Sequence, residues 1–301
     1  MKPRTYTTPA AFKAALNHRL RAAAGPVVGI ARRRQLLVFD RYLARLVRVL
    51  GDTAILKGGL VLELRLDRAR TTQDIDLRLV GSPEGLLSRL QEAGQLDLGD
   101  FMSFEIRADA RHPDIAGPGV RYEGQRFRAE CRLAGMLYGQ PFGVDVAFGD
   151  PILGEPEVIT GDDLLAFAGI AAPELRVYPV ETHVAEKLHA YTIPRTSPNT
   201  RMKDLPDLAL LGQVGPRDAR LLRAALVQTF EFRATHPIPT HLMDPPEEWR
   251  EPYAAIVEED ALPWTTLGEV TAAARGFLGP VLSAPSTDAR WDPGTGTWSA
   301  K

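Results

Sequence analysis

The feature that most constrains the fold is a strand–turn–helix–strand pattern between residues 53 and 80. A short apolar strand is predicted over 53–57, and the turn Lys57-Gly58-Gly59 leads into a short helix from Leu60 to Leu66. The segment from Asp74 to Val80 then alternates polar and apolar residues, which is typical of a strand with one buried face. Strands and helices that alternate over so few residues predict a sheet covered by helices.

Two carboxylates stand at the start of the second predicted strand. Asp74 and Asp76 are two residues apart, so in a strand both side chains point to the same side. Neighbouring carboxylates repel each other, and a divalent cation commonly relieves the repulsion. The Gly58-Gly59 turn before a helix offers exposed backbone N–H groups, which suit a phosphate. Each piece alone is common in purely structural roles, but their order favours phosphoryl or nucleotidyl transfer.

A third carboxylate lies on a later predicted strand, Gly143 to Phe148. Val144, Val146 and Phe148 fall on one face of this strand and Asp145 falls on the other. If that other face is buried, Asp145 needs a partner or a metal. The alternative is an edge strand whose polar face is solvated.

Composition limits the class of protein. The 301 residues are 45% hydrophobic and 25% charged, which is ordinary for a globular chain of one large or two small domains. Cys131 is the single cysteine, which excludes an intrachain disulfide and a multi-cysteine zinc site. No apolar run approaches the roughly 20 residues of a membrane span, and residues 1–17 lack a secretory signal. We therefore expect a soluble, cytoplasmic protein that does not contact a membrane.

The patterns divide the chain into four parts. We predict a basic N-terminal helical segment over residues 1–50, an α/β core over 51–160, a helical lobe over 161–282 and a loosely held tail over 283–301. The further strands expected in the core are 101–108, 120–122, 127–133 and 142–148. The expected helices are 9–25, 33–50, 83–95, 161–169, 180–192, 203–213, 216–235, 248–258 and 266–282.

Charge is unevenly distributed along the chain. Residues 1–50 hold eleven Lys and Arg against one acid, whereas residues 241–301 hold ten acids against four bases. A basic end on a near-neutral protein suggests an anionic partner on one face. The alternative is that Arg32, Arg33 and Arg34 form only the solvated face of a helix.

A second basic group is predicted on the strands of the core. Arg126 and Arg128 flank Phe127, and Arg121 precedes them, so the three arginines could line a groove for an RNA backbone. The alternative is a surface of ion pairs, because Glu123 and Glu130 are close by.

Together these motifs resemble the AbiEii-type nucleotidyltransferases, the toxins of type IV toxin–antitoxin systems, which include the mycobacterial MenT proteins. Lys57-Gly58-Gly59 with Arg70-Thr71-Thr72-Gln73-Asp74-Ile75-Asp76 looks like the first motif of that family. Ala185 to Ala190, which contains Lys187, resembles its lysine motif, and Arg201 to Leu208 resembles its Asp-x-x-Asp motif. Residues 229–239 are similar but less specific. The resemblance covers roughly residues 50–240.

The resemblance implies an α+β fold: a polymerase-β-like nucleotidyltransferase core, with a mixed sheet and flanking helices, and a helical C-terminal lobe. It implies Mg²⁺ and a nucleoside triphosphate, the acceptor end of tRNA as a partner, and a cognate AbiEi-type antitoxin encoded nearby. The implied metal ligands are Asp74, Asp76 and Asp145, with Asp145 also able to help deprotonate the attacking hydroxyl.

The remaining implied site residues bind the nucleotide or complete the site. Lys187 would hold the triphosphate as a point charge, and Asp207 would complete the site or fix Lys187. Phosphate contacts are implied for Lys57, Gly58, Gly59 and Thr72. Without the resemblance, Lys187 would read as a solvated lysine beside Glu186. His183 and His189 are expected to pack or to lie on the helix surface rather than to bind metal.

Two positions depart from the family pattern. Leu60 stands where relatives carry Ser or Thr, so one hydroxyl ligand for the phosphate is missing. Pro206 falls between Asp204 and Asp207, and proline is tolerated only in the first turn of a helix. We therefore expect this helix to begin near Asp204, with Asp204 as a structural N-cap and Asp207 as the functional acid.

Two other functions stay open at this point. One is a nucleotidyltransferase that modifies a protein or a small molecule. The basic N-terminal segment favours RNA instead, and its removal is expected to reduce transfer to RNA more than nucleotide binding. The other is a non-catalytic binding module of the same fold, which the missing hydroxyl at Leu60 permits. The five residues Asp74, Asp76, Asp145, Lys187 and Asp207 together weigh against that second function.

Overall fold

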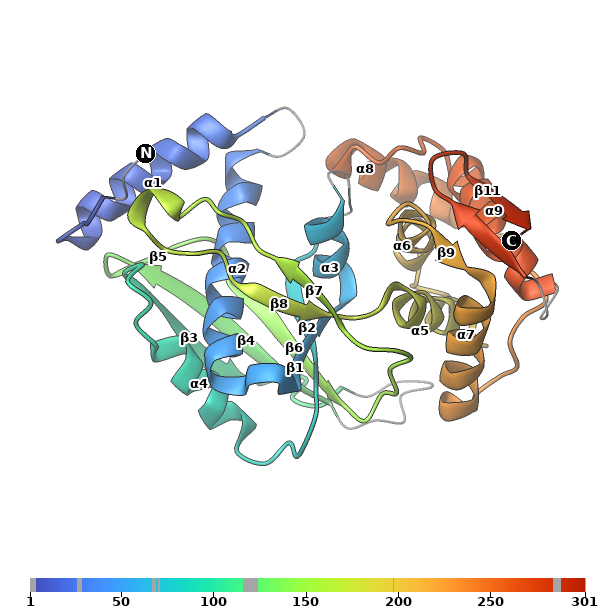
Figure 1. Cartoon of the computed structure of the whole chain (residues 1–301), viewed down its shortest axis with the longest axis horizontal. Helices are drawn as coiled ribbons and strands as arrows, with labels where there is room; N and C mark the ends of the chain where they lie inside the picture. Colours follow the sequence, from blue (N-terminus) through green and yellow to red (C-terminus); the bar gives the residue numbers. More distant parts are fainter. Residues whose placement is uncertain are drawn as a thin grey trace.

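The computed structural model describes residues 4–25, 29–66, 69, 71–115, 124–196, 198–283 and 288–300. In Figure 1 these residues form two lobes side by side, a sheet with covering helices and a mainly helical lobe. The helices are α1 (Pro9–Ala23), α2 (Ile30–Leu50), α3 (Gly58–Arg65), α4 (Leu86–Gln95), α5 (Val180–Thr192), α6 (Asp204–Leu211), α7 (Ala219–Arg233), α8 (Arg250–Asp260) and α9 (Leu267–Ser283). The strands are β1 (Ala54–Lys57), β2 (Asp74–Leu79), β3 (Met102–Ala108), β4 (Gly124–Leu133), β5 (Met136–Leu137), β6 (Phe142–Phe148), β7 (Glu157–Thr160), β8 (Glu174–Val177), β9 (Arg217–Asp218), β10 (Ala289–Asp292) and β11 (Thr297–Ala300).

The larger sheet is mixed. Its strands follow the order β3-β4-β6-β2-β1-β8-β7, with β5 beside β4. Strand β2 runs antiparallel to β1 and parallel to β6, and the parallel pairing sets Asp76 opposite Asp145. The predicted α+β class, with a mixed sheet and flanking helices, is confirmed.

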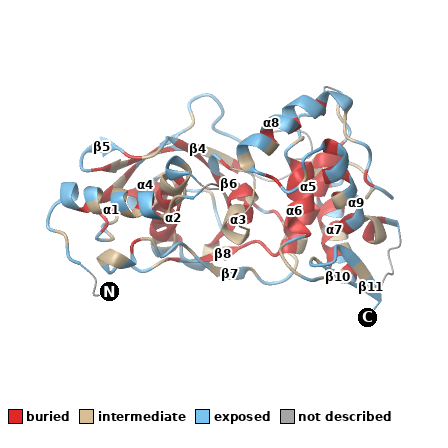
Figure 2. Cartoon of the chain, turned by 90° about the horizontal axis from the view of Figure 1, so that it is seen from above, coloured by how far each residue is buried: buried red, intermediate tan, exposed pale blue. Residues whose placement is uncertain are grey.

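Apolar periodicity explains how the N-terminal lobe packs. In β2 the alternating residues Ile75, Leu77 and Leu79 are buried. Long helix α2 covers the sheet, and its buried stripe is visible in Figure 2. Its Phe39 and Tyr42 rings pack in edge-on and tilted contacts on aromatic rings of the sheet, which fixes the helix against β3 and β6.

The C-terminal lobe has its own core, built from α5, α6, α7 and α9. Helix α6 begins at Asp204, close to the predicted position, so Pro206 lies in the first turn where it costs no helical hydrogen bond. Short helix α3 lies between the lobes, because Leu60 and Val61 pack in the N-terminal core while Leu62 packs in the C-terminal one.

One predicted helix is wrong. Residues 161–169 form turns with a single 3₁₀ segment, Ala166–Ala168, instead of an α-helix. They connect two unpredicted strands, β7 and β8, and β8 pairs in parallel with β1. Leu164, Leu165 and Phe167 have a helix-like spacing, but they pack on the N-terminal core from a loop. The sheet therefore extends past residue 160.

The end of the chain is also more ordered than predicted. Instead of a loosely held tail from Ser283, strands β10 and β11 form a hairpin that pairs with β9. Trp291 is buried and donates a hydrogen bond to the Gly212 carbonyl, and the Trp298 ring stacks on Phe277. Burial of the two indole rings against α9 stabilises this segment. The predicted strand 120–122 lies outside the described residues.

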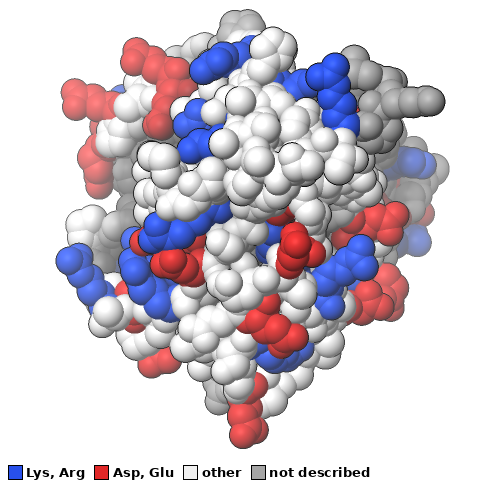
Figure 3. All heavy atoms as spheres, turned by 90° about the vertical axis from the view of Figure 1, so that its left-hand side faces the viewer, with Lys and Arg blue, Asp and Glu red and all other residues white. Residues whose placement is uncertain are grey.

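Much of the basic N-terminal charge is bound inside the protein. Arg41 and Arg45 are buried and form ion pairs with Asp100. Arg32 forms an ion pair with Glu63. On the face of Figure 3, the side chains of Lys and Arg are interspersed with those of Asp and Glu. Within the described parts of the chain, no helix is both long and apolar enough to cross a membrane.

Candidate active site

A cavity of about 390 Å³ opens where helix α3 meets both lobes. It brings together seven of the predicted site residues, which come from the β1–α3 junction, the segment entering β2, and helix α5: Lys57, Gly58, Gly59, Thr72, Asp74, Asp76 and Lys187. Asp145 and Asp207 lie next to this set rather than in the lining. Asp145 neighbours Asp76 on the adjacent strand, and Asp207 contacts Lys187.

The glycine turn is shaped by Asp76. Gly58 has a φ of +72°, a region that favours glycine. A Cβ at this position would lie 2.0 Å from Oδ2 of Asp76. Only glycine therefore lets the start of α3 approach the carboxylate so closely. Leu60 is buried in the core and does not line the cavity, so its departure from the family pattern leaves the wall unchanged.

Backbone contacts hold the two acids of β2 at the cavity. Asp74 is exposed, and its Oδ1 accepts a hydrogen bond from the Gly143 N–H at 3.0 Å. Burial raises the pKa of Asp76 to about 7, and the nearby carboxylates of Asp145 and Asp74 add to the shift, while Lys57 and Lys187 oppose it. Negative charge is thus costly at Asp76 until a cation arrives.

Asp145 is held by an arginine. Arg126 Nε donates to Asp145 Oδ2 at 3.0 Å, across the β4–β6 pair. Burial raises the pKa of Asp145, and Arg126 partly offsets the rise. Arg128 pairs with Asp109 at 3.6 Å. Both arginines are therefore in ion pairs, but their partners are Asp145 and Asp109, whereas Glu130 pairs with Arg107. Arg121 and Glu123, which the two interpretations also named, lie outside the described residues.

Thr72 is held in place by its backbone. Its N–H donates to Glu63 Oε1 at 2.6 Å, and its carbonyl accepts from Arg32 Nη1 at 2.8 Å. Arg32, one of the three arginines considered as a solvated face, thus stabilises the segment that leads into β2. The Thr72 side chain is buried beside the cavity.

Lys187 lies between two carboxylates of α6. Its Nζ is 2.9 Å from Asp204 Oδ1 and 2.7 Å from Asp207 Oδ2. Burial lowers the pKa of Lys187, but the two acids outweigh this effect and raise the pKa above its ordinary value. The ammonium is therefore charged at neutral pH.

The expected division of roles between the two acids needs correction. Asp204 does not cap α6, because its side chain accepts no hydrogen bond from the first turn of the helix. It lines the cavity, and its Oδ2 is buried with no hydrogen-bond partner among the described residues. Asp207 is fully buried beneath Lys187. The geometry thus favours Asp207 as the anchor of Lys187 and Asp204 as the acid that faces a ligand.

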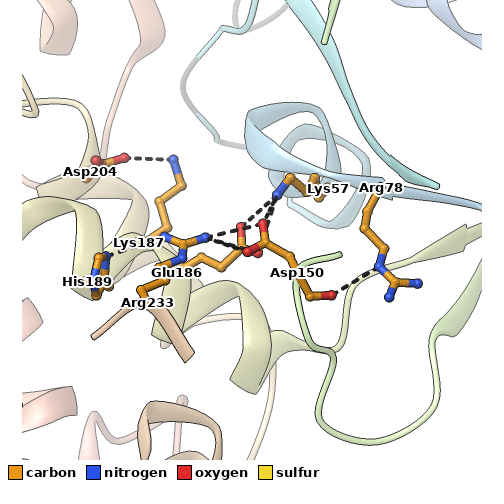
Figure 4. Close-up of polar contacts among 8 residues, drawn as sticks. All are labelled: Lys57, Arg78, Asp150, Glu186, Lys187, His189, Asp204 and Arg233. Carbon is orange, nitrogen blue, oxygen red and sulfur yellow. Dashed lines mark hydrogen bonds and ion pairs between the residues drawn. The ribbon is translucent and has the colours of Figure 1, made fainter. Parts of the chain in front are cut away.

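Figure 4 shows a second group of charges beside Lys57, to which β1, the loop after β6, α5 and α7 contribute. Lys57 Nζ lies 3.2 Å from Asp150 Oδ2 and 3.0 Å from Glu186 Oε2. Arg233 Nη2 lies 3.3 Å from Asp150 and 3.5 Å from Glu186. Although burial acts to raise it, the pKa of Glu186 falls to about 2 because of Lys57 and Arg233. This cluster of Lys57, Asp150, Glu186 and Arg233, here called the charge network, links the two lobes.

Three members of the charge network were not predicted as site residues from the sequence. Glu186 appeared only as the neighbour of Lys187, Asp150 was not considered, and Arg233 appeared only within the less specific stretch 229–239. No local spacing connects residues 57, 150, 186 and 233. The only signal was that each acid or base lies beside a strongly apolar segment.

The two histidines of α5 are buried and line the cavity. Burial, reinforced by Lys187, lowers the pKa of His183 to about 3. Burial and Arg233 do the same for His189, whose Nε2 lies 2.8 Å from the Thr235 hydroxyl and whose ring packs edge-on against Phe230. Both are packed residues, as predicted.

The residues at the cavity suit a hard cation that is shared with a substrate. Within the described residues, no three acidic, histidine or cysteine side chains converge closely enough to form a complete metal site. Asp74 and Asp76 nevertheless supply carboxylate oxygens, and Mg²⁺ commonly takes one or two carboxylates and completes its shell with phosphate oxygens and water. The raised pKa of Asp76 shows that its negative charge is unfavourable in the present surroundings, and such a cation would stabilise that charge.

Comparison with solved structures shows which known proteins have a similar fold. The mycobacterial toxin MenT4, a nucleotidyltransferase toxin of Mycobacterium tuberculosis H37Rv, shares the fold with a TM-score of 0.56 at 18% identity, over 93% of this chain and 90% of that one. JHP933 from Helicobacter pylori aligns with a TM-score of 0.46 at 16% identity, over 83% and 90% of the two chains. No curated protein matches the sequence.

The family described as the nucleotidyl transferase AbiEii toxin of type IV toxin–antitoxin systems matches residues 41–273. This range contains every predicted site residue and the whole charge network. It covers well over half of the chain, and it confirms the family resemblance found in the sequence motifs. The chain therefore belongs to the AbiEii family of nucleotidyltransferase toxins.

Proposed function

We propose that this nucleotidyltransferase transfers a nucleotide from a nucleoside triphosphate to the 3′ end of tRNA, with Mg²⁺ as the metal, and thereby blocks translation. The observation that carries the proposal is the cavity itself, in which the Asp74 and Asp76 carboxylates and the Gly58-Gly59 turn line the same space as Lys187. A triphosphate with a metal ion needs this combination of oxygen ligands, backbone amides and a cation.

Each residue has a proposed role. Asp74 and Asp76, with Asp145 beside them, would hold the metal, which supplies charge neutralisation and polarises the phosphate oxygens. The amides at Gly58 and Gly59, with Lys57 and Thr72, would bind phosphate, and Lys187 would hold the triphosphate as a point charge. Asp207 would act through Lys187 by fixing its ammonium.

The reaction is an in-line displacement. The 3′ oxygen of the acceptor forms a bond to the α-phosphorus, the bond between the α-phosphorus and its bridging oxygen breaks, and pyrophosphate leaves. The hydroxyl proton passes to a carboxylate. Positioning and charge neutralisation account for the rate, without a covalent enzyme intermediate.

Family membership implies an antitoxin partner. We propose that it is an AbiEi-type protein encoded nearby and that both act in the cytoplasm. A transferase that modifies a protein or a small molecule remains the alternative. The family assignment favours an enzyme over a binding module.

The test is incubation of the purified protein with total tRNA, Mg²⁺ and each α-labelled nucleoside triphosphate in turn. We expect label on tRNA, and none with Asp74→Ala, which removes an exposed carboxylate and leaves the fold intact. Label on the protein or on a small molecule instead would support the alternative acceptor. Full activity of the Asp74→Ala variant would disprove the assignment of the site.

A further inference from the structure

Three cations on the segment between α5 and α6 line the mouth of the cavity: Arg195, Arg201 and Lys203. Arg201 and Lys203 are exposed. Within the described parts of the chain, none of the three side chains has a carboxylate within ion-pairing distance. Lys187 and Arg233, deeper in the same cavity, are each bound to two carboxylates. Asp204 attracts Arg195 from the same cavity but forms its ion pair with Lys187, so the mouth keeps a surplus of positive charge.

Arg195 is held in place but incompletely satisfied. Its Nη2 donates to the Ala190 carbonyl at 3.0 Å, which fixes the guanidinium at the end of α5. Its Nε is buried with no hydrogen-bond partner among the described residues. Burial, together with repulsion from Arg201, lowers the pKa of Arg195. An anion at this position would satisfy the free donor and relieve the repulsion.

A second cavity of about 370 Å³ adjoins the first at Arg195, which lines both. Its other walls combine apolar residues, among them Tyr191, Ile193 and Met243, with polar ones that include the carboxylate of Asp244, which pairs with Arg275. Unpaired nucleotides are bound by such surfaces, since the base needs an apolar or planar contact and the phosphate needs a cation. Arg195 thus lies between a partly apolar cavity and the basic mouth of the cavity that Asp74 and Asp76 line.

We infer that Arg195, Arg201 and Lys203 bind the phosphate backbone at the single-stranded 3′ end of the RNA acceptor, which reaches the first cavity from the second. The inference rests on the proposed function, since it names where that acceptor binds. The triphosphate is a second source of phosphate, but the glycine turn, Lys57 and Lys187 already offer it groups deeper in the cavity. The inference also assigns RNA binding to the segment between α5 and α6 instead of the basic N-terminal segment.

The test compares two double variants that remove the same charge. Arg201→Gln/Lys203→Gln removes exposed cations from the mouth, and Arg21→Gln/Arg48→Gln removes exposed cations from the N-terminal segment. Binding of a fluorescently labelled tRNA is measured by anisotropy over a range of salt concentrations, and KM for the nucleoside triphosphate and for tRNA is measured in parallel. Arg195→Gln is a third variant for the partly buried cation.

For the variant at the mouth, we expect binding of tRNA to weaken about tenfold and the slope of log affinity against log salt to fall by about 1.4, or ~0.7 per lost contact to a single strand. The KM of the mouth variant for the triphosphate should stay near the wild-type value. The N-terminal variant should bind tRNA with near wild-type affinity. A larger effect of the N-terminal variant, a rise only in KM for the triphosphate, or no binding of tRNA by the wild type would overturn the inference. Binding that responds as expected without any transfer of label would support it while disproving the proposed function.

Discussion

The two walls of the active-site cavity hold their charges in different ways. The wall from the sheet carries Asp74 and Asp76, which are placed by strand register and by a backbone N–H. The helical wall carries Lys187 and Arg233, and each of these cations is held by buried or half-buried carboxylates of the same lobe or of the lobe interface. Acids on one side are therefore fixed by the backbone, and cations on the other side by ion pairs.

Because of this difference, substitutions on the two walls should affect stability differently, even where both reduce transfer. A carboxylate of the sheet wall repels its neighbours, so its removal should not destabilise the fold. Removal of a cation from the helical wall leaves buried carboxylates without a partner, which is expensive. The following predictions test this contrast, in decreasing order of their effect on transfer.

Among the substitutions that test this contrast, Lys187→Met should reduce transfer the most. We expect transfer to fall by about a thousandfold, because the variant lacks the cation proposed to hold the triphosphate. The free energy of unfolding should fall by about 3–5 kcal/mol, because Asp204 and Asp207 lose their partner. Denaturant unfolding and initial rates measure the two losses. The double variant Lys187→Met/Asp207→Leu should recover much of the stability without recovering activity. Recovery of both would show that Lys187 acts only through stability.

Gly58→Ala should reduce transfer by about a hundredfold. The new Cβ would lie 2.0 Å from Asp76 Oδ2, so the carboxylate or the turn must move, and small displacements of a catalytic group cost about this much. Gly85→Ala is the matched control, because Gly85 also has a positive φ, +66°, but a Cβ there meets open space. The positive φ alone should cost each variant about 1 kcal/mol of stability, and Gly58→Ala should lose more because its Cβ also displaces Asp76. Equal activities of the two variants would contradict the close approach to Asp76.

Asp150→Asn tests the charge network, with an expected tenfold rise in KM for the triphosphate and a smaller change in kcat. Asp150 is buried and does not line the cavity, so it acts by positioning Lys57 and Arg233. Loss of its charge should also lower the free energy of unfolding by about 3 kcal/mol. Glu157→Gln is the control, because this acid pairs with Arg65 but is 44% exposed, so its loss should cost at most about 1 kcal/mol. A rise in KM as large in the control would show that the network has no special role.

The sequence was sufficient where short-range patterns decide the structure. Alternation in Asp74 to Leu79 and the preceding glycine pair predicted the strand, the turn and the shared side of Asp74 and Asp76. The position of Asp145 on the polar face of a later strand also followed from alternation. That this strand pairs in parallel with β2, with Asp145 opposite Asp76, is seen only in the structure. Register between strands that are distant in sequence is set by packing, which a single sequence does not display.

The errors have the same origin. Strands β7 and β8 are four residues each, too short for periodicity to separate them from loops. The Pro- and Gly-containing end of the chain reads as flexible, yet Trp291 and Trp298 anchor it on α9. The expected N-cap at Asp204 was wrong because the position of proline predicts where a helix begins, but it does not predict that the Asp204 side chain turns towards Lys187 instead of the first turn of α6.

Substitution of Asp40 should have the smallest effect on transfer. It therefore tests the effect of a buried carboxylate on the free energy of unfolding alone. Like Asp76, it has a pKa raised to about 7, here because burial outweighs the attraction of Arg41 and because Asp162 is near. Its Oδ1 is buried without a hydrogen-bond partner among the described residues, and it lies outside the cavity. Asp40 lies away from the groups proposed to bind substrate and metal, so ionisation of its buried carboxyl affects the free energy of unfolding and not transfer.

The sign of the pH dependence follows from the raised pKa. Between about pH 4 and pH 7 the folded protein keeps a proton on Asp40 that the unfolded chain has released, so stability falls as pH rises, by about 1.4 kcal/mol per unit. Asp40→Asn should remove this contribution. The free energy of unfolding of the variant should therefore rise relative to that of the wild type up to about pH 7, and the difference should stay constant above that pH. Urea unfolding of both proteins from pH 5 to 8 measures the difference, and transfer should be unchanged. Parallel stability profiles would mean that Asp40 is already charged in the folded protein, and that burial alone does not raise a carboxyl pKa on this side of the sheet.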